Sequence, residues 1–305
     1  MNHFDTHHLL QIVSSVAGTQ DYPQSCLYLV PTPIGNLADM TLRALHVLYI
    51  ADSIACEDTR HAQHLLNQYG IKKKKLFPLH QHNEQEATAQ LIQYLQQGQK
   101  VALITDAGTP AISDPGARAV QAVRQAGFRT IPLPGASSII TAMSAAGLTH
   151  GSTLFYGFLP SKAQERQMVL QKLLTTPDAV VLLEAPHRIK ALLTELAHQA
   201  AERTVTVARE LSKQFEQIVT LTAAKLPHWL ESKVEHSKGE FVCIIHAPSV
   251  HQPGKHHQYD DVLQKALTYM PTKVAANIIA SLTGASKNEL YQRAITFKNK
   301  QNGSD

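Results

Sequence analysis

Three short runs combine glycine and proline with acidic or hydroxyl side chains, and each follows an apolar stretch. They occupy residues 31–36 (PTPIGN), 106–116 (DAGTPAISDPG) and 132–138 (PLPGASS). Asp106 can accept hydrogen bonds from a hydroxyl or an amine, and Gly108 lets a ligand approach the main chain. Open α/β sheets bind ligands at the carboxyl ends of parallel strands. The three runs therefore predict one composite pocket, although a plain turn capped by Asp106 explains the middle run equally well.

Two acidic runs could add catalytic groups to that pocket. Residues 57–60 (EDTR) and 184–188 (EAPHR) each begin where an apolar stretch ends. A carboxylate there can act as a base or as a hydrogen-bond acceptor. Glu57 and Asp58 are adjacent, so their side chains diverge and do not form an obvious carboxylate pair. A structural role is equally plausible for Asp58, as the N-cap of a helix that begins near His61.

Basic and glycine residues near later strand ends have two interpretations each. His187 and Arg188 would face outward near a phosphate, or they begin a helix whose arginine is solvated. Gly239, in the run 238–240 (KGE), marks either the close approach of a ligand or only a turn.

Several familiar motifs are missing. The chain holds no GxGxxG after its first apolar stretch, no GxxxxGK[ST], no GxSxG and no HExxH, which argues against NAD, ATP and covalent or zinc-dependent hydrolysis. Its three cysteines, Cys26, Cys56 and Cys243, lie far apart in apolar runs, so we expect buried thiols in a cytoplasmic protein. His80 and His82 could hold a metal, but chance explains such a pair among 17 histidines, and no metal is expected.

Apolar stretches alternate with segments of helical periodicity from Cys26 onward. Strands are expected at 27–30, 53–56, 76–79, 100–105 and 129–132. Helices are expected at 37–49, 61–69, 83–97 and 115–126. Gly70 and Gly98 follow two of these helices, as glycine commonly does. The alternation predicts βαβ units with a parallel sheet, in an N-terminal α/β domain over residues 25–135.

A second α/β domain is expected over residues 136–247. Its strands are predicted at 153–158, 179–183, 204–208, 216–222 and 240–246. Its helices are predicted at 136–146, 163–174, 189–199 and 223–230. The connection 209–215 is too short for a helical crossover, so some antiparallel pairing is expected. Residues 1–24 are expected to be a weakly ordered extension with one short helix around 9–16.

Residues 248–257 are predicted to be a linker, because Pro, Gly, Ser, Gln and His follow one another without periodicity. Residues 258–305 show three helical patterns, and a glycine-bearing turn at 283–286 gives the last two a helix-turn-helix outline. No stretch approaches 18 apolar residues and residues 1–24 lack a signal-peptide pattern, so no membrane span is expected. The net charge of +4 is compatible with nucleic acid without requiring it.

Six motifs occur in an order that resembles the tetrapyrrole methylase superfamily, the class III methyltransferases. They are 29–37 (LVPTPIGNL), 57–60 (EDTR), 106–110 (DAGTP), 134–137 (PGAS), 184–188 (EAPHR) and 238–241 (KGEF). The second and fifth motifs are the specific ones, and they are similar to the bacterial branch that methylates the cytidine 2′-hydroxyl in small-subunit ribosomal RNA. The resemblance covers about residues 25–250, and 287–291 (KNELY) is also typical. Ala136 departs from the pattern, which often has proline there.

The resemblance implies two α/β domains with S-adenosylmethionine (SAM) in the cleft between them. It also implies a homodimer that acts on 16S ribosomal RNA, in the small ribosomal subunit. The residues implied to bind the cofactor are Pro33, Gly35, Asp106, Gly108, Thr109, Ile112, Ser137, Leu183, Glu184 and Gly239.

A ribose hydroxyl is a poor nucleophile, so a base or a strong acceptor should assist methyl transfer. Glu57, Asp58 and Glu184 are the candidates for that role. The candidates for binding RNA phosphates are Arg60, His187, Arg188 and Arg209. The helical tail is expected to be an RNA-docking appendage.

Two other functions fit parts of this pattern. A methyltransferase that acts on a corrin or porphyrin precursor would need a large apolar cleft and no RNA-docking tail. A non-catalytic RNA-binding relative would have no need of intact cofactor loops, whereas the loops of this chain look whole.

Overall fold

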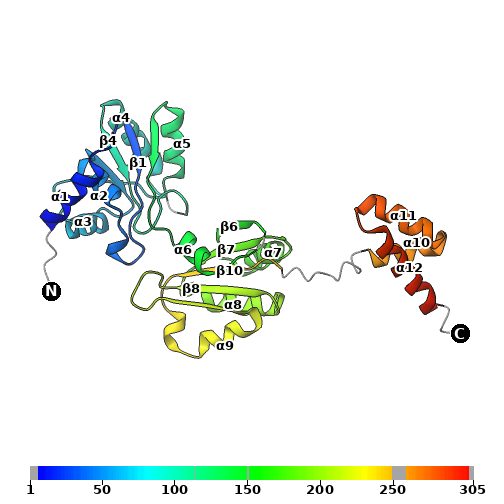
Figure 1. Ribbon diagram of the computed structural model, residues 1–305. Helices are drawn as coiled ribbons and strands as arrows, with labels where there is room; N and C mark the ends of the chain where they lie inside the picture. Colours follow the sequence, from blue (N-terminus) through cyan, green and yellow to red (C-terminus); the bar gives the residue numbers. More distant parts are fainter. Residues whose placement is uncertain (1–5, 114, 150, 249–258, 302–305) are drawn as a thin grey trace. The chain divides into compact units, whose positions relative to one another are not determined.

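The computed structural model describes residues 6–113, 115–149, 151–248 and 259–301. The chain divides into two compact units, Met1–His246 and Ala247–Asp305. The first unit contains two five-stranded sheets, and the second is helical (Figure 1). This architecture agrees with the predicted pair of α/β domains followed by a helical appendage.

The first sheet is entirely parallel, with the strand order β3-β2-β4-β1-β5. Its strands are β1 (Cys26–Leu29), β2 (Ser53–Cys56), β3 (Lys75–Pro78), β4 (Lys100–Leu103) and β5 (Arg129–Pro132). Its crossover helices are α2 (Leu42–Ile50), α3 (Thr59–Gln68), α4 (Glu84–Gln96) and α5 (Ala117–Gln125). Because every strand runs in the same direction, all five carboxyl ends lie at one edge of the sheet. The loops at that edge carry four of the runs singled out in the sequence, at 31–36, 57–60, 106–116 and 132–138.

Helices cover both faces of this sheet, as parallel sheets require. In Figure 1, α2 and α3 lie on one side of the strands, and α4 and α5 lie on the other. Leu48 and Leu66 pack against Ile54 on the first side. Leu91 and Leu95 pack with Val101 on the second. Burial on both faces explains why these strands are apolar throughout rather than alternating.

The N-terminal extension corrects one expectation. Residues 6–17 form helix α1 (Thr6–Ala17), which packs against α2 and completely buries Val13. Beyond the helix, the Tyr22 hydroxyl donates to the Ala17 carbonyl, 2.9 Å away, and the Tyr22 ring lies 4.8 Å from the His46 ring. The short helix expected around 9–16 is confirmed and extends over 6–17, but its packing against α2 does not fit the weak order that was expected of this segment. A few apolar positions anchor this otherwise polar segment to the core.

The second sheet is mixed, with the order β6-β7-β10-β8-β9. Its strands are β6 (Thr153–Phe158), β7 (Ala179–Glu184), β8 (Thr204–Arg209), β9 (Gln217–Thr222) and β10 (Phe241–Ile245). Its helices are α6 (Ser138–Ala145), α7 (Ala163–Leu174), α8 (Ile189–Gln199) and α9 (Leu226–Glu231). β6 and β7 are parallel, whereas β10 pairs antiparallel with β7 and β8, and β9 antiparallel with β8. The expected antiparallel pairing is confirmed.

Two apolar clusters sandwich the second sheet. One side packs against α7, α8 and α9, with Leu170, Leu193 and Leu226 fully buried. The other side packs against α6 and also reaches Ile34, from the loop after β1. The second cluster therefore joins the two sheets. All three cysteines are buried free thiols, as predicted.

The C-terminal unit consists of α10 (Asp260–Tyr269), α11 (Thr272–Thr283) and α12 (Lys287–Gln301) around a small core. Gly284 ends α11 in a left-handed conformation, with φ of 70°. Arg293 forms an ion pair with Asp260, which ties α12 to α10. Most of the predicted linker lies outside the described residues.

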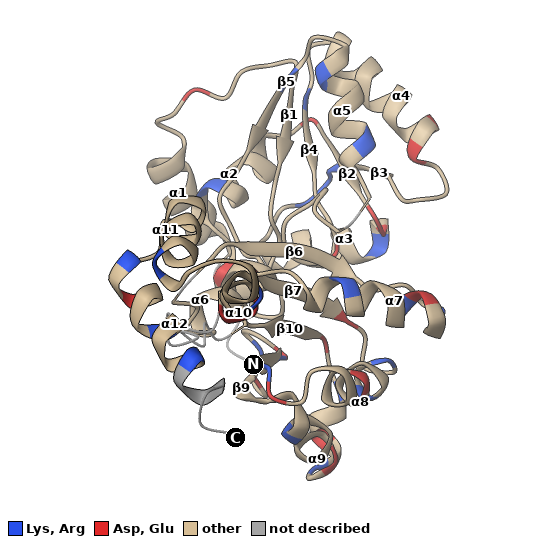
Figure 2. Ribbon diagram, turned by 90° about the vertical axis from the view of Figure 1, so that its right-hand side faces the viewer, with Lys and Arg blue, Asp and Glu red and all other residues tan. Residues whose placement is uncertain are grey.

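Figure 2 shows Lys and Arg positions on both sheet domains and on the C-terminal helices. No helix within the described ranges has both the length and the apolar content to cross a membrane.

Candidate functional site

Loops from both sheets line one cavity of about 450 Å³. From the first sheet come Ile34, Glu57, Thr105, Asp106, Ala107, Gly108, Thr109, Ile112 and Ser113. The rest of the lining is Ser137, Ser138, Ile139, Phe158, Leu183, Glu184, Ala185, Pro186, Leu211, Glu240, Phe241 and Val242. The volume falls in the range of small-molecule sites, roughly 300–1,000 Å³. The predicted composite pocket is confirmed, because each of the three glycine- and proline-bearing runs contributes to it.

Backbone and hydroxyl hydrogen bonds tie these three runs together. Thr32 and Gly108 exchange two backbone hydrogen bonds of 2.9 Å. The Thr32 hydroxyl donates to the Thr105 carbonyl at 3.0 Å, and the Thr109 hydroxyl donates to the Ala136 carbonyl at 3.0 Å. Gly108 has φ of 81°, where a side chain would be strained. Part of the cavity wall is thus a set of turns that hydrogen bonds link to one another.

Glu184 ends β7 and is almost fully buried in the cavity wall, with 2% of its surface exposed. Its Oε1 accepts from the Ala185 amide at 2.9 Å and lies 3.0 Å from Nε of Arg188. Its Oε2 is buried and has no hydrogen-bond partner among the described residues. Burial raises the pKa of this carboxyl above its ordinary value, against the lowering effects of the Ala185 amide and Arg188. Glu184 is therefore a residue of the cavity lining with one buried oxygen that the described residues leave without a partner.

Arg188 is occupied by protein groups. Besides its ion pair with Glu184, its Nη2 donates to the carbonyls of Leu159 and Pro160, at 2.6 and 3.2 Å. It therefore fastens the end of β6 to the end of β7 and holds Glu184 in place. These hydrogen bonds use Nη2 alone, and the phosphate-binding role of Arg188 stays a prediction. His187 beside it is exposed.

The two acids of the 57–60 run have separate positions. Glu57 lines the cavity and is half-buried. Asp58 is outside the lining and caps α3, accepting from the amides of Arg60 and His61 at 2.7 and 3.4 Å. The Arg60 side chain, 3.0 Å away, is the main reason that the pKa of Asp58 falls to about 2. Asp58 is thus explained by its capping role, while Arg60 is highly exposed, with 92% of its side chain accessible.

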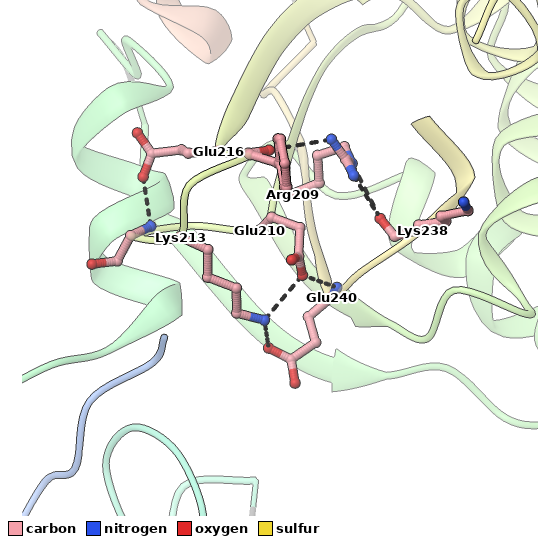
Figure 3. A network of polar contacts seen from close by, with 8 residues as sticks. Arg209, Glu210, Lys213, Glu216, Lys238 and Glu240 are labelled. Carbon is pink, nitrogen blue, oxygen red and sulfur yellow. Dashed lines mark hydrogen bonds and ion pairs between the residues drawn. The ribbon is translucent and has the colours of Figure 1, made fainter. Parts of the chain in front are cut away.

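The connection between β8 and β9, residues 210–216, forms one rim of the cavity and is called the rim loop. Leu211 from this loop and Glu240 before β10 both contribute to the lining. Figure 3 shows Nζ of Lys213 between the carboxylates of Glu210 and Glu240, at 2.9 and 3.2 Å. Glu210 also accepts from the Glu240 amide at 3.2 Å. These contacts clamp the rim loop to the segment that leads into β10.

The rim loop also reaches the other sheet. Ser212 donates from its hydroxyl to Asp39, which lies between β1 and α2. The stem of Lys213 lies over Gly35, where an added methyl group would come within 2.3 Å of Cγ of Lys213. Gly35, at φ of 144°, is therefore required for packing between the two domains. It is outside the cavity lining, and so is Pro33.

Arg209 corrects another expectation. Its side chain is buried, and it donates to the Lys238 carbonyl at 3.0 and 3.1 Å and to the Phe215 carbonyl at 3.3 Å. It supports the base of the rim loop and is not available to an RNA phosphate. Gly239 lies outside the lining, and an added methyl group there would meet Glu210 at 2.3 Å. These surroundings favour the interpretation of Gly239 as a turn residue over the interpretation that a ligand approaches it closely.

The remaining predicted cofactor residues lie together in the lining: Asp106, Gly108, Thr109, Ile112, Ser137, Leu183 and Glu184. Sequence reasoning missed Phe158, Leu211 and Glu240. Glu240 lies within the 238–241 motif, whereas Phe158, at the end of β6, and Leu211, in the rim loop, belong to no motif of the sequence. Among the described residues, no group of three or more His, Cys, Asp or Glu side chains could hold a metal ion.

Comparisons with known proteins agree with this geometry. The profile of the family Tetrapyrrole (Corrin/Porphyrin) Methylases matches residues 26–227, and that of the RsmI C-terminal HTH domain matches 255–298. A Neisseria meningitidis protein named ribosomal RNA small subunit methyltransferase I is 40% identical over 96% of this chain and 99% of its own length.

Solved structures share the fold. Diphthine synthase aligns with a TM-score of 0.56 at 15% identity, over 74% of this chain and 92% of that one. Uroporphyrin-III C-methyltransferase from Thermus thermophilus, complexed with S-adenosylhomocysteine, aligns with a TM-score of 0.50 at 17% identity, over 72% of this chain and 96% of that one. At these identities the likeness concerns the fold alone.

Proposed function

The chain belongs to the tetrapyrrole methylase family and, within it, to the ribosomal RNA small subunit methyltransferase I proteins. We propose that it methylates small-subunit ribosomal RNA with SAM as the methyl donor. The acceptor that we propose is the ribose 2′-hydroxyl of a cytidine in 16S ribosomal RNA. The observation that carries this proposal is the cavity, which gathers strand-end loops of both sheets around the buried carboxylate of Glu184.

The cavity suits SAM in size and in chemistry. Asp106 is partly exposed in the lining and can accept from hydroxyl or amino groups. The turn around Gly108 and Thr109 presents backbone to the cavity, and Ser137 and Leu183 complete the opposite side. When bound, the cofactor would supply an electrophilic methyl group on a sulfonium centre. The protein would bind and orient the reactants, because this displacement gains most from positioning.

The second task of the site is to receive the proton of the attacking hydroxyl. Glu57 and Glu184 line the cavity, and Asp58 is engaged as a helix cap. Of the two lining acids, Glu184 combines an unpartnered oxygen with a raised pKa. A base is most effective when its pKa lies near the working pH. We therefore assign the acceptor role to Glu184, with Arg188 as the residue that positions it.

The RNA-binding part of the proposal uses groups that are accessible. Arg60 and His187 are exposed; in the sequence, Arg60 follows the lining residue Glu57 by three positions and His187 directly follows the lining residue Pro186. The C-terminal helical unit is proposed to dock the RNA. A homodimer, which the family resemblance implies, belongs to the same proposal, and sedimentation of the full chain tests it.

The test is transfer of tritiated methyl from SAM to three acceptors: purified small ribosomal subunits, free 16S ribosomal RNA and uroporphyrinogen. The proposal expects label on RNA in the first or second reaction and none on uroporphyrinogen. Label on uroporphyrinogen alone would favour the tetrapyrrole-precursor function. SAM binding by calorimetry without transfer to any acceptor would count against the proposed substrate, and no SAM binding would favour a non-catalytic RNA-binding protein.

A further inference from the structure

The C-terminal unit carries a hollow of about 280 Å³ between two of its helices. Lys273, Ala276 and Asn277 of α11 line it together with Lys287, Asn288 and Tyr291 of α12. Residues four apart lie on the same face of a helix, so Lys273 adjoins Asn277 and Lys287 adjoins Tyr291. The hollow, called the α11–α12 hollow, thus brings two cations, two amides and one phenol ring to one place.

The charged residues that line the hollow are both positive. Lys273 and Lys287 are exposed, and neither has an ion pair with a described residue. No acidic side chain is among the described residues that line the hollow. Arg293 of α12, by contrast, forms an ion pair with Asp260, and this pair holds α12 to α10. The two lysines are therefore available to an anionic ligand, while the arginine stabilises the unit.

The other polar groups suit a nucleobase. Asn277 has a buried Oδ1 with no hydrogen-bond partner in the described part of the unit. An amide both accepts and donates, so it can pair with the edge of a base. Tyr291 is 38% exposed, and single-stranded bases stack on aromatic rings of this kind. Proteins that read RNA by its bases most often bind unpaired nucleotides in this way.

We propose that the α11–α12 hollow binds one nucleotide of single-stranded RNA. Lys273 and Lys287 contact the flanking phosphates, Tyr291 stacks on the base, and the Asn277 and Asn288 amides bond to its edge. This assignment rests on the proposed function, because it supposes that the substrate is RNA. It goes beyond that function by assigning the RNA contact of the helical unit to the residues of one hollow and by specifying a single unpaired nucleotide as its ligand.

Fluorescence anisotropy of the full chain with a labelled single-stranded RNA oligonucleotide tests the assignment. The double variant Lys273→Ala/Lys287→Ala should weaken binding about tenfold or more. It should also reduce the salt slope, which is the change in the logarithm of the binding constant with the logarithm of the salt concentration. The slope should become smaller in magnitude by about 1.4, since each phosphate contact to a single strand contributes about 0.7. Tyr291→Ala should weaken binding about tenfold with an unchanged slope. Lys265→Ala, at an exposed lysine of α10 outside the hollow, is the matched control and should bind as wild type.

A second measurement needs no variant. Acetylation of the wild-type protein should be slowed by bound RNA at Lys273 and Lys287 and unaffected at Lys265. Equal affinity and equal salt slope for the double variant and the control, or equal acetylation with and without RNA, overturns the assignment. Methyl transfer by the wild type separates the two proposals. If the wild type transfers methyl to RNA but the double variant binds RNA as tightly as the wild type, only the assignment of the hollow is rejected. If the wild type binds RNA through the hollow but transfers no methyl group, only the proposed function is rejected.

Discussion

Glu184 and Arg188 face each other at the end of β7, with 3.0 Å between Oε1 and Nε, while the second oxygen of Glu184 has no partner among the described residues. Arg188 in turn holds the carbonyls that follow β6. The buried acid is therefore held through one oxygen, while the other is buried without a partner. The proposed role as proton acceptor uses this asymmetry, with Oε1 keeping the orientation of the carboxylate and Oε2 left to accept the proton.

Glu184→Gln should lower kcat for methyl transfer by at least about 100-fold, since general base catalysis typically contributes that much. In the wild type, kcat should rise with pH as the carboxyl ionises, and the midpoint should lie above the ordinary carboxyl pKa of 4.5. The variant should lose this rise. The control is Glu57→Gln, which should keep the rise in kcat with pH. If Glu57→Gln lost the rise in kcat with pH and Glu184→Gln kept it, the proton acceptor would be Glu57.

Asp58 should matter for acid stability and not for methyl transfer. Its pKa is lowered in the folded protein, from 3.8 to about 2. Its ionised form therefore stabilises the fold above pH 3.8, and this contribution disappears as the pH falls toward 2. Asp58→Asn should keep kcat, and its stability relative to wild type should improve as the pH is lowered from 5 to 3. Urea unfolding at several pH values measures this difference, and a constant difference would contradict the assignment.

Gly35→Ala should disturb the rim loop. The substitution places a side chain at an unfavourable φ, at a cost of about 1–3 kcal/mol, and it pushes against the stem of Lys213. We expect weaker SAM binding by calorimetry, although Gly35 does not line the cavity. Adding Lys213→Ala should restore part of the affinity, because it removes the colliding atoms. Strictly additive effects of the two substitutions would argue against the contact.

Arg209→Ala should destabilise the protein by about 2–4 kcal/mol, because it leaves the carbonyls of Lys238 and Phe215 without their donor. The salt slope of RNA binding should not change. Urea unfolding and anisotropy titrations measure the two quantities. A stable variant with a reduced salt slope would restore Arg209 as a phosphate ligand.

Removing residues 247–305 should weaken RNA binding and spare SAM binding. The cavity is built entirely by the first compact unit, and the α11–α12 hollow belongs to the second. Calorimetry with SAM and anisotropy with RNA on the truncated chain measure each effect separately. RNA affinity equal to that of the full chain would reject a docking role for the helical unit.

The sequence predicted the parallel sheet and the pocket because both depend on local patterns. Apolar runs such as 100–105 are recognisable as buried strands, and the loops that follow them must meet at one sheet edge. The same logic found Glu184 and Asp106. It also found the capping alternative for Asp58, which the structure supports.

The errors concern residues whose roles depend on distant partners. Arg209 ends a strand like a site residue, yet it is buried by the loop that it supports. Gly35 and Gly239 carry the glycine signal of a ligand site, but side chains of Lys213 and Glu210 occupy the space beside them. A helix around 9–16 was expected, but its packing against the core was not, because two buried positions, Val13 and Ala17, give little periodic signal in a polar segment. Local patterns do not reveal which tertiary neighbour fills a space.

The most direct measurement is mass spectrometry of nucleosides from small ribosomal subunits treated with SAM and either the wild type or Glu184→Gln. The proposed function predicts 2′-O-methylcytidine with the wild type and at least about 100-fold slower formation with the variant. Methylation on a base, or no methylated nucleoside from a wild-type protein that binds SAM, would contradict it.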